Sequence, residues 1–336
     1  MIPAHLCVGS LALNDTVYAD GRTSMAAPGG NALYAAVAAR IWSEAVGIVA
    51  VVGYDWPPGY TEALIDGGID TRGLISLEAE TVRAWTIYEA DGFRRYFSRN
   101  REVVPLTPSP YSSTPPTPAQ IQAYNEAARR VHLRMSPRPQ DLQPDLWGAR
   151  TLHLCPMRIE TVETWLEALA SHTRIVRSVD ILPYAVQGDL DDVRLLGLLS
   201  NIDVFMPSEI EARALQPDYE AETLCRELAA RGPRVVVIKE GERGAAVYDR
   251  ETDRCRRVPA YPAQVTDLTG AGDSFCGGFS VGYALSGDPF EAALYGTVSA
   301  SFIIEGFGGL HALAVTRRQA EARLAELRRM SDIGLV

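Results

Sequence analysis

The fold is decided by one stretch, Thr266-Asp267-Leu268-Thr269-Gly270-Ala271-Gly272-Asp273, and by the apolar run that follows it, Ser274-Phe275-Cys276-Gly277-Gly278-Phe279. The pattern is typical of a loop that enters a helix. Residues 270–272 have side chains too small to shield their backbone amides, so these N–H groups can converge on an anion at the helix N-terminus. Asp273 lies in the first turn, where the helix dipole tolerates a carboxylate. It is therefore the candidate general base beside an anion hole.

Three other interpretations of this stretch are weaker. Simple helix capping by Asp267 or Thr269 would not require three small residues in a row. A hydrolase nucleophile elbow needs glycine where the chain has Cys276. A dinucleotide-binding fingerprint needs glycine where the chain has Phe275. The residues favour the anion hole.

Composition indicates an ordinary globular protein of 336 residues, with 47% hydrophobic and 22% charged residues. The formal net charge of -10 argues against nucleic acid, whose phosphates need a basic surface. The longest apolar stretch, residues 45–52, is far shorter than the ~20 residues of a membrane helix, so we expect no membrane partner. The five cysteines include no Cys-x-x-Cys pair, which predicts buried thiols in a reducing cytoplasm.

Two early segments place candidate residues at the ends of predicted elements. Leu6–Gly9 is a short apolar strand, and Asp15 follows it where an open α/β sheet presents side chains to a ligand. By local sequence alone, Asp15 would be a turn residue. Pro28-Gly29-Gly30-Asn31 precedes an alanine-rich helix over residues 32–39, for which Asn31 is the expected N-cap.

The next part of the chain predicts a hairpin and then a surface excursion. Aromatic and β-branched residues over Thr81–Phe97 flank Asp91-Gly92, the expected two-residue turn. Nine of the 21 prolines then lie between Val104 and Pro144, which excludes a central strand. We expect one helix, Ala119–Leu133, within this excursion.

Strands and helices alternate in the second half, which predicts a parallel sheet with crossover helices. The expected elements are strands 151–154, 174–179 and 202–205, with helices 159–170 and 190–199 between them. Asp180 and Ser208-Glu209-Ile210-Glu211 come directly after strands, at the edge where ligands bind. Another buried strand, Arg234–Lys239, ends in a turn that contains Gly241 and Gly244.

The order of these motifs resembles that of the ribokinase-like (PfkB-type) carbohydrate kinase family, over essentially the whole chain. Residues 267–273 are similar to its second signature, with Leu268 where the family usually has threonine. Gly29-Gly30-Asn31 is similar to its first signature, with Tyr34 where many members carry a second asparagine. Ser208-x-x-Glu211 is similar to its Asn-x-x-Glu motif, with serine in place of asparagine.

The resemblance implies a ribokinase-like three-layer α/β/α fold with a mainly parallel central sheet and a small β-sheet lid. It implies one kinase domain over residues 1–336, with the lid at about 16–27 and 81–103 and the proline-rich excursion at about 104–144. Many such kinases are dimers through the lid, so we expect a homodimer.

The resemblance also assigns roles to residues of this chain. In the family, the equivalent of Asp273 takes the proton from the acceptor hydroxyl, and the amides of Gly270, Ala271 and Gly272 hold the transferred phosphoryl group. It places the acceptor at Asp15, Gly29, Gly30 and Asn31, and the nucleotide at Ser208, Lys239, Gly241 and Gly244. Glu211 would organise Mg²⁺ through water. The implied cofactors are ATP and Mg²⁺, with a monovalent cation as a further candidate.

The expected function is therefore ATP-dependent phosphoryl transfer to a hydroxyl of a small sugar or polyol. A nucleoside kinase is the alternative within the fold, since the aromatic lid could stack a base. A ribokinase-like binding or regulatory protein without turnover is the alternative from another class, in view of Ser208 and Leu268. The hairpin also carries Arg94, Arg95 and Arg99, which could grip an acidic acceptor if one of them points inward.

Overall fold

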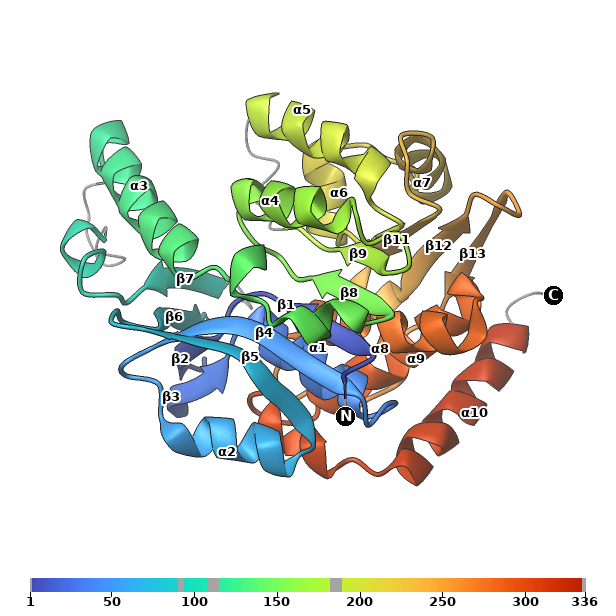
Figure 1. Cartoon of the computed structure of the whole chain (residues 1–336), viewed down its shortest axis with the longest axis horizontal. Coiled ribbons are helices and arrows are strands. Elements are labelled where there is room, and N and C mark those ends of the chain that lie inside the picture. The colour runs from blue at the N-terminus through green and yellow to red at the C-terminus, as the bar shows by residue number, and fades with distance from the viewer. Residues whose placement is uncertain (1, 90–93, 108–114, 182–188, 334–336) are drawn as a thin grey trace.

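The computed structural model describes residues 2–89, 94–107, 115–181 and 189–333. In this part of the chain, nine strands form a central sheet in the order β13-β12-β11-β10-β9-β8-β1-β4-β5 (Figure 1). Neighbours are parallel from β11 to β5, and β12 and β13 are added antiparallel at one edge. The strands are β1 (His5–Val8), β4 (Val46–Gly53), β5 (Ile69–Leu77), β8 (Thr151–Leu154), β9 (Val176–Val179), β10 (Val204–Phe205), β11 (Val235–Lys239), β12 (Ala245–Asp249) and β13 (Arg254–Val258). The mainly parallel sheet that the alternating pattern predicts is confirmed.

Helices cover both faces of this sheet, which gives the three-layer α/β/α architecture (Figure 1). One face carries α1 (Asn31–Arg40), α2 (Pro58–Asp66), α8 (Ala271–Ser286), α9 (Pro289–Ile303) and α10 (Arg317–Ile333). The other carries α4 (Ile159–Leu169), α5 (Asp189–Leu198), α6 (Glu209–Leu215) and α7 (Ala221–Ala229). Successive strand residues point to opposite faces, so Cys7 packs in the first layer while Leu6 and Val8 pack in the second. All eight residues of β4 are buried, as expected of a strand covered on both sides.

A second, four-stranded sheet lies at one end of the central sheet (Figure 1). Its order is β3-β2-β6-β7, with β2 (Ala12–Val17), β3 (Thr23–Gly29), β6 (Val82–Tyr88) and β7 (Arg94–Ser98). Together β2 and β3 cover residues 12–29, a wider range than the expected lid segment of about 16–27. The β6–β7 pair is antiparallel, as the hairpin pattern predicts, but the Asp91-Gly92 turn lies outside the described residues. We call β2, β3, β6 and β7 the small sheet.

Within its described residues, 104–107 and 115–144, the proline-rich excursion contains one α-helix, α3 (Pro118–Arg134), where a single helix over 119–133 is expected. Thr117 and Gln120 form a capping box at its start. Ala127 and Val131 pack beneath the small sheet with Ala12 and Val82. Short 3₁₀ turns make up much of the rest: η1 (Val104–Leu106), η2 (Pro139–Asp141) and η3 (Pro144–Gly148). Further 3₁₀ turns are η5 (Leu199–Asn201), η6 (Gly241–Arg243) and η7 (Leu310–Ala314). None of the helices in the described ranges is both long and apolar enough to cross a membrane.

Candidate active site

The N-terminus of α8 presents backbone amides to the space in front of it. Its N-cap, Gly270, has φ 79° and ψ 4°, and no side chain in the described structure caps the helix. Ala271 and Ser274 donate to backbone carbonyls, whereas Gly272 and Asp273 have no backbone acceptor among the described residues. The capping alternative is therefore wrong, and amides that lack a backbone acceptor suit an anion.

Tyr34 explains why residue 270 is glycine. Its ring lies against the loop, so a Cβ placed on Gly270 would come within 2.3 Å of the ring, in a left-handed conformation that L side chains rarely adopt. The Ser274 hydroxyl also donates to the Tyr34 carbonyl, at 3.4 Å. These contacts hold the N-terminus of α1 beside that of α8. They bring the Gly29–Asn31 segment next to the 270–273 segment.

A buried ion pair lies behind the amides. The Nζ atom of Lys239, the last residue of β11, lies 2.5 Å from Oδ2 of Asp180, which directly follows β9. Both side chains are buried, and the Lys239 ammonium also donates to the Cys276 sulfur at 3.4 Å. A Cβ added to Gly272 would lie 3.5 Å from the same Nζ atom. Lys239 therefore adds a positive charge to the N-terminus of α8.

The pKa of the Asp273 carboxyl group is raised, which favours its neutral form. Its burial and the neighbouring Asp180 carboxylate raise its pKa from the usual 3.8 to about 7, while Lys239 opposes the rise. Burial disfavours the Lys239 ammonium, but the Asp180 carboxylate outweighs it and raises the pKa of Lys239 well above its usual value. Lys239 is therefore a permanent cation, and Asp273 can exchange a proton near neutral pH.

Ser208 and Glu211 form a capping box at the start of α6. Ser208 N donates to Oε2 of Glu211 at 2.6 Å, and the Ser208 hydroxyl donates to the same oxygen. The strand-like bridge between Ser208 and Lys239 brings the box beside the ion pair. Burial and the Asp180 carboxylate raise the pKa of Glu211. A structural role thus explains the Ser208-x-x-Glu211 spacing, in addition to any ligand role.

The residues of this site suit Mg²⁺ only when phosphates are bound as well, because the phosphates would supply further oxygen ligands. Within the described ranges, no group of three or more His, Cys, Asp or Glu side chains could hold a metal ion. Both Ser208 hydrogen bonds fall on Oε2 of Glu211, so Oε1 has no hydrogen-bond partner among the described residues. Mg²⁺ prefers oxygen ligands and keeps several waters, using one or two carboxylates plus substrate phosphates. The hard oxygen donor of Glu211 meets that requirement.

The turn after Lys239 is tied to α6. Gly241 and Gly244 bound the 3₁₀ turn η6 with φ of 61° and 86°. Arg243 pairs with Glu209 at 2.8 Å, and Glu240, which is buried, forms an ion pair with Arg257. The turn thus lies next to the ion pair and the capping box, at the carboxyl ends of β10 and β11. The two glycines therefore lie beside the Lys239–Asp180 ion pair and the Ser208–Glu211 capping box.

Asn31 is the first residue of α1 rather than its N-cap, so the capping prediction is wrong. The N-cap is Gly30, whose φ of 99° and close approach to the Ser10 carbonyl (2.3 Å from an added Cβ) require glycine. The side chain of Asn31 instead accepts from Ser10 N at 2.8 Å and donates to the Pro156 carbonyl at 2.6 Å. It joins the loops that follow β1 and β8.

Asp15 lies at a bulge in β2 and is held within the small sheet. Its Oδ1 accepts from Ala26 N at 2.7 Å, and its Oδ2 accepts from Trp85 Nε1 at 2.9 Å. Its neighbour Asn14 lies against the Gly29–Gly30 segment instead, because a Cβ on Gly29 would come within 2.1 Å of Asn14 Nδ2. The Asn14 amide has no hydrogen-bond partner among the described residues.

The sequence did not indicate three features of the site. These are the place of Asn14 against Gly29, the packing of the Tyr34 ring against Gly270, and the ion pair between Asp180 and Lys239. The alternation of a strand could have separated Asn14 from Asp15, since adjacent residues point to opposite faces. The pairing of β9 with β10 and of β10 with β11 brings Asp180 near Lys239. That strand order is not readable from one sequence.

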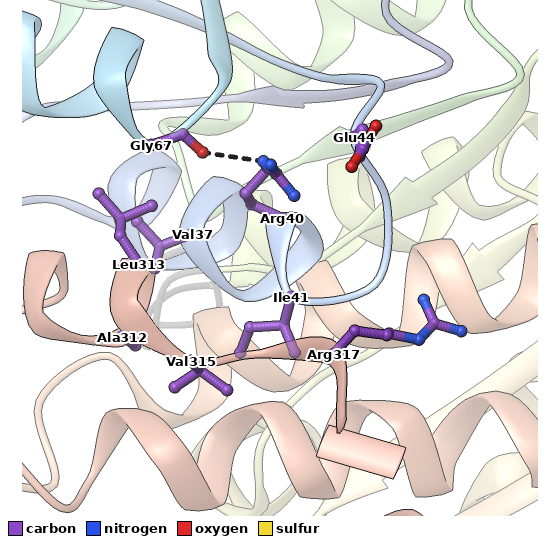
Figure 2. A pocket seen from close by; sticks show the side chains of 9 residues that line it. All are labelled: Val37, Arg40, Ile41, Glu44, Gly67, Ala312, Leu313, Val315 and Arg317. Carbon is purple, nitrogen blue, oxygen red and sulfur yellow. Dashed lines mark hydrogen bonds between the residues drawn. The ribbon is translucent and has the colours of Figure 1, made fainter. Parts of the chain in front are cut away.

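A separate pocket of about 250 Å³ lies at the other end of α1 (Figure 2). Its lining residues are Val37, Arg40, Ile41, Glu44, Gly67, Ala312, Leu313, Val315 and Arg317. Arg40 donates from Nε to the Gly67 carbonyl at 2.8 Å, as Figure 2 shows. None of the candidate site residues lines this pocket. The site at the strand ends is therefore distinct from it.

Comparison with known proteins shows the family and the fold of the chain. The family model for pfkB carbohydrate kinases matches residues 6–314. A cytidine kinase of Thermococcus kodakarensis is 27% identical over 289 residues, which cover 84% of this chain and 89% of that protein.

Solved structures share the fold at low sequence identity. A nucleoside kinase of Methanocaldococcus jannaschii, of the ribokinase family, superimposes with a TM-score of 0.71 and 20% identity, covering 97% of this chain and 99% of its own. A protein of Escherichia coli assigned to ribokinase II, solved in complex with ATP and Mg²⁺, gives a TM-score of 0.73 and 19% identity, covering 96% and 99%.

Proposed function

The chain belongs to the pfkB family of carbohydrate kinases, and from that membership we propose that it transfers the γ-phosphoryl group of ATP to a hydroxyl of a small sugar or polyol. One observation carries the proposal. The Asp273 carboxyl, whose pKa is raised, lies in the first turn of a helix where the amides of Gly272 and Asp273 have no backbone acceptor among the described residues, with the Lys239 ammonium beside them. A base, an anion hole and a fixed cation are the parts that phosphoryl transfer requires.

In the proposed reaction, Asp273 accepts the proton of the acceptor hydroxyl while the hydroxyl oxygen bonds to the γ-phosphorus. The bond between that phosphorus and the bridging oxygen of ADP breaks, and ADP leaves with the electron pair. A base with a pKa of about 7 accepts a proton effectively at neutral pH. The protein needs no covalent intermediate, because positioning and charge stabilisation supply most of the catalysis.

The free amides of Gly272 and Asp273 would face the phosphoryl oxygens during transfer. Lys239 would offset their negative charge, and because Asp180 fixes the ammonium, no reorganisation is required. Gly241 and Gly244 would border the rest of the nucleotide. Glu211 would hold Mg²⁺ through water, and the ion would supply charge neutralisation at the phosphates when bound.

The acceptor would lie between the small sheet and the N-terminus of α1. We assign its binding to Gly29, Gly30 and Asn14, with Asn31 and Asp15 fixing the surrounding loops through their hydrogen bonds. The small sheet would then act as a lid that excludes water from the phosphoryl group.

A nucleoside acceptor is the second candidate. The cytidine kinase relative, matched over 84% of this chain, favours it. The reacting group would again be a sugar hydroxyl, so the same base and anion hole would serve. The difference lies in whether the lid side also holds a base.

We further propose a cytoplasmic homodimer that forms through the small sheet. Its edge strands β3 and β7 expose Met25 (54%) and Tyr96 (56%), large side chains that a second copy could cover. Cys7, Cys155, Cys225 and Cys276 are buried free thiols, in keeping with a reducing compartment. Light scattering of the purified chain tests the dimer, and a monomer with full activity would refute it.

The activity is tested by ADP formation with ATP, Mg²⁺ and K⁺ against matched panels of neutral sugars, acidic sugars and nucleosides. We expect acceptor-dependent ADP formation with one panel, and a phosphorylated product by mass spectrometry. ATP binding without turnover on every panel would instead favour a binding or regulatory protein.

A further inference from the structure

Two tyrosines of the small sheet hydrogen-bond to the loop that precedes the anion hole. Tyr88, the last residue of β6, donates from its hydroxyl to Oδ1 of Asp267 at 3.0 Å and lies 3.1 Å from the Thr269 hydroxyl. Tyr18, directly after β2, donates to Oδ2 of Asp267 at 3.2 Å. The two rings are stacked, with centroids 5.6 Å apart and planes 11° apart. Each carboxylate oxygen of Asp267 therefore accepts from one tyrosine.

The same carboxylate shapes the loop itself. Asp267 Oδ1 also accepts from the Thr269 backbone amide at 2.9 Å and from the Thr269 hydroxyl at 2.7 Å. Thr269 directly precedes Gly270, whose left-handed turn starts α8. Asp267 is only 7% exposed, so little water is available to replace the tyrosine hydroxyls if they leave. Burial and the Asp267 carboxylate raise the pKa of Tyr18, which keeps its hydroxyl a neutral donor.

The contact continues to the segment after α9. The Tyr18 ring lies 4.8 Å from the ring of Phe307, and the Arg22 guanidinium lies 5.6 Å and 5.2 Å from these two rings. Arg22 is paired with Asp20 at 2.6 Å. Tyr18 and Tyr88, at the ends of β2 and β6, therefore contact the loop before α8, and Tyr18 also contacts the segment after α9.

We propose that Tyr18 and Tyr88 are positioning residues that link closure of the small sheet to the geometry of the anion hole. When the sheet is closed, the two hydroxyls fix Asp267, Asp267 fixes Thr269, and the Gly270 turn then presents its amides correctly. When the sheet opens, Asp267 loses both donors and the turn loosens. The inference rests on the proposed kinase function, and it gives that function a means of delaying transfer until the acceptor is covered.

The test uses the full chain and the variants Tyr18→Phe, Tyr88→Phe and their double. These changes remove only hydroxyl groups and keep the rings that pack. Tyr54→Phe, at an exposed position directly after β4, is the matched control. Three quantities are measured: kcat for transfer to the best acceptor, the KM for ATP, and amide hydrogen exchange over residues 266–274 without ligand.

We expect each single variant to lower kcat about tenfold, in line with the loss of a hydrogen bond to a charged group. The KM for ATP should stay unchanged, and exchange over 266–274 should become faster in the double variant. Tyr54→Phe should change none of the three. Transfer by the double variant at the parent rate would overturn the proposal while leaving the kinase function intact. If the parent transfers to no acceptor, the proposed function itself fails, and the positioning role falls with it.

Discussion

The raised pKa of Asp273 predicts that this side chain makes folding less favourable as the pH rises. Its pKa is raised from 3.8 to about 7 in the folded protein by burial and by Asp180. The folded state therefore holds a proton on Asp273 between pH 4 and 7, where the unfolded state has lost it. The stability contributed by that proton is complete below the unfolded pKa and is lost as the pH rises through the folded pKa.

The size of the effect follows from the two pKa values. From pH 5 to pH 8 the single group should remove about 2–3 kcal/mol from the free energy of unfolding, at 1.36 kcal/mol per pKa unit. Asp273→Asn removes this titration. The free energy of unfolding of the variant, relative to that of the parent, should therefore rise by the same amount from pH 5 to pH 8. Nearby residues titrate in both proteins and largely cancel in the difference.

The assay is urea unfolding of parent and Asp273→Asn at pH 5, 6.5 and 8. Asp66→Asn, which changes an exposed carboxylate at the end of α2, is the control and should run parallel to the parent. We expect Asp273→Asn to be more stable than the parent at pH 8. Functional sites commonly contain groups that lower the stability of the fold, so replacing them stabilises the protein. Parallel curves for parent and Asp273→Asn would refute the raised pKa of Asp273 in the folded protein.

Three further outcomes are expected. Lys239→Met should lower kcat about 10²–10³-fold through lost charge stabilisation, and it should destabilise the fold by leaving Asp180 unpaired. The double variant Lys239→Met/Asp180→Asn should regain stability but not activity. Recovery of both stability and activity would refute a catalytic role for the lysine. Glu211→Gln should raise the Mg²⁺ concentration needed for half-maximal rate while keeping its helix cap, because glutamine also serves in a capping box; Glu209→Gln is the control, and identical Mg²⁺ titrations would leave Glu211 as a cap only. Asn14→Ala should raise the KM for the acceptor about tenfold, the weight of one or two hydrogen bonds, without changing the KM for ATP; an unchanged acceptor KM would remove Asn14 from the site.

Much of the fold could be predicted because its signals are local. The β-branched run of β4 and the alternation after residue 150 reflect burial and crossover connections, which the sequence shows directly. Helix α3 was predicted within one residue at each end, since Thr117 and the prolines mark its start. The small sheet has wider limits than expected, because β2 contains Asn14-Asp15, a pair typical of turns, and β3 contains Pro28 and Gly29.

The site was harder to predict because side-chain direction depends on register and contacts. Asp15 and Asn14 are adjacent in sequence, yet one hydrogen-bonds to Trp85 and the other lies against Gly29. Asn31 has the residue type of an N-cap, but Gly30 takes that place and Asn31 bonds to two loops that are distant in sequence. The hydrogen bonds from Tyr18 and Tyr88 to Asp267 join residues about 180–250 positions apart, which one sequence cannot reveal.

The anionic-acceptor hypothesis for the hairpin arginines receives a partial answer. The Arg99 guanidinium lies 4.3 Å from the Trp85 ring, and Arg95 pairs with Glu89 at 2.8 Å. Both cations thus have partners within the small sheet. We therefore expect neutral acceptors to be preferred, and faster turnover of acidic sugars, reduced by Arg99→Ala, would contradict this.

The most direct test of the central claim compares the parent with Asp273→Asn in two measurements on the same samples. Calorimetry gives the Kd for ATP with Mg²⁺, and a coupled assay gives kcat for transfer to the best acceptor. We expect the Kd to stay nearly unchanged while kcat falls about 10²–10⁴-fold, the range for loss of a general base. Transfer by Asp273→Asn within a few-fold of the parent would contradict the assignment of Asp273 as the base.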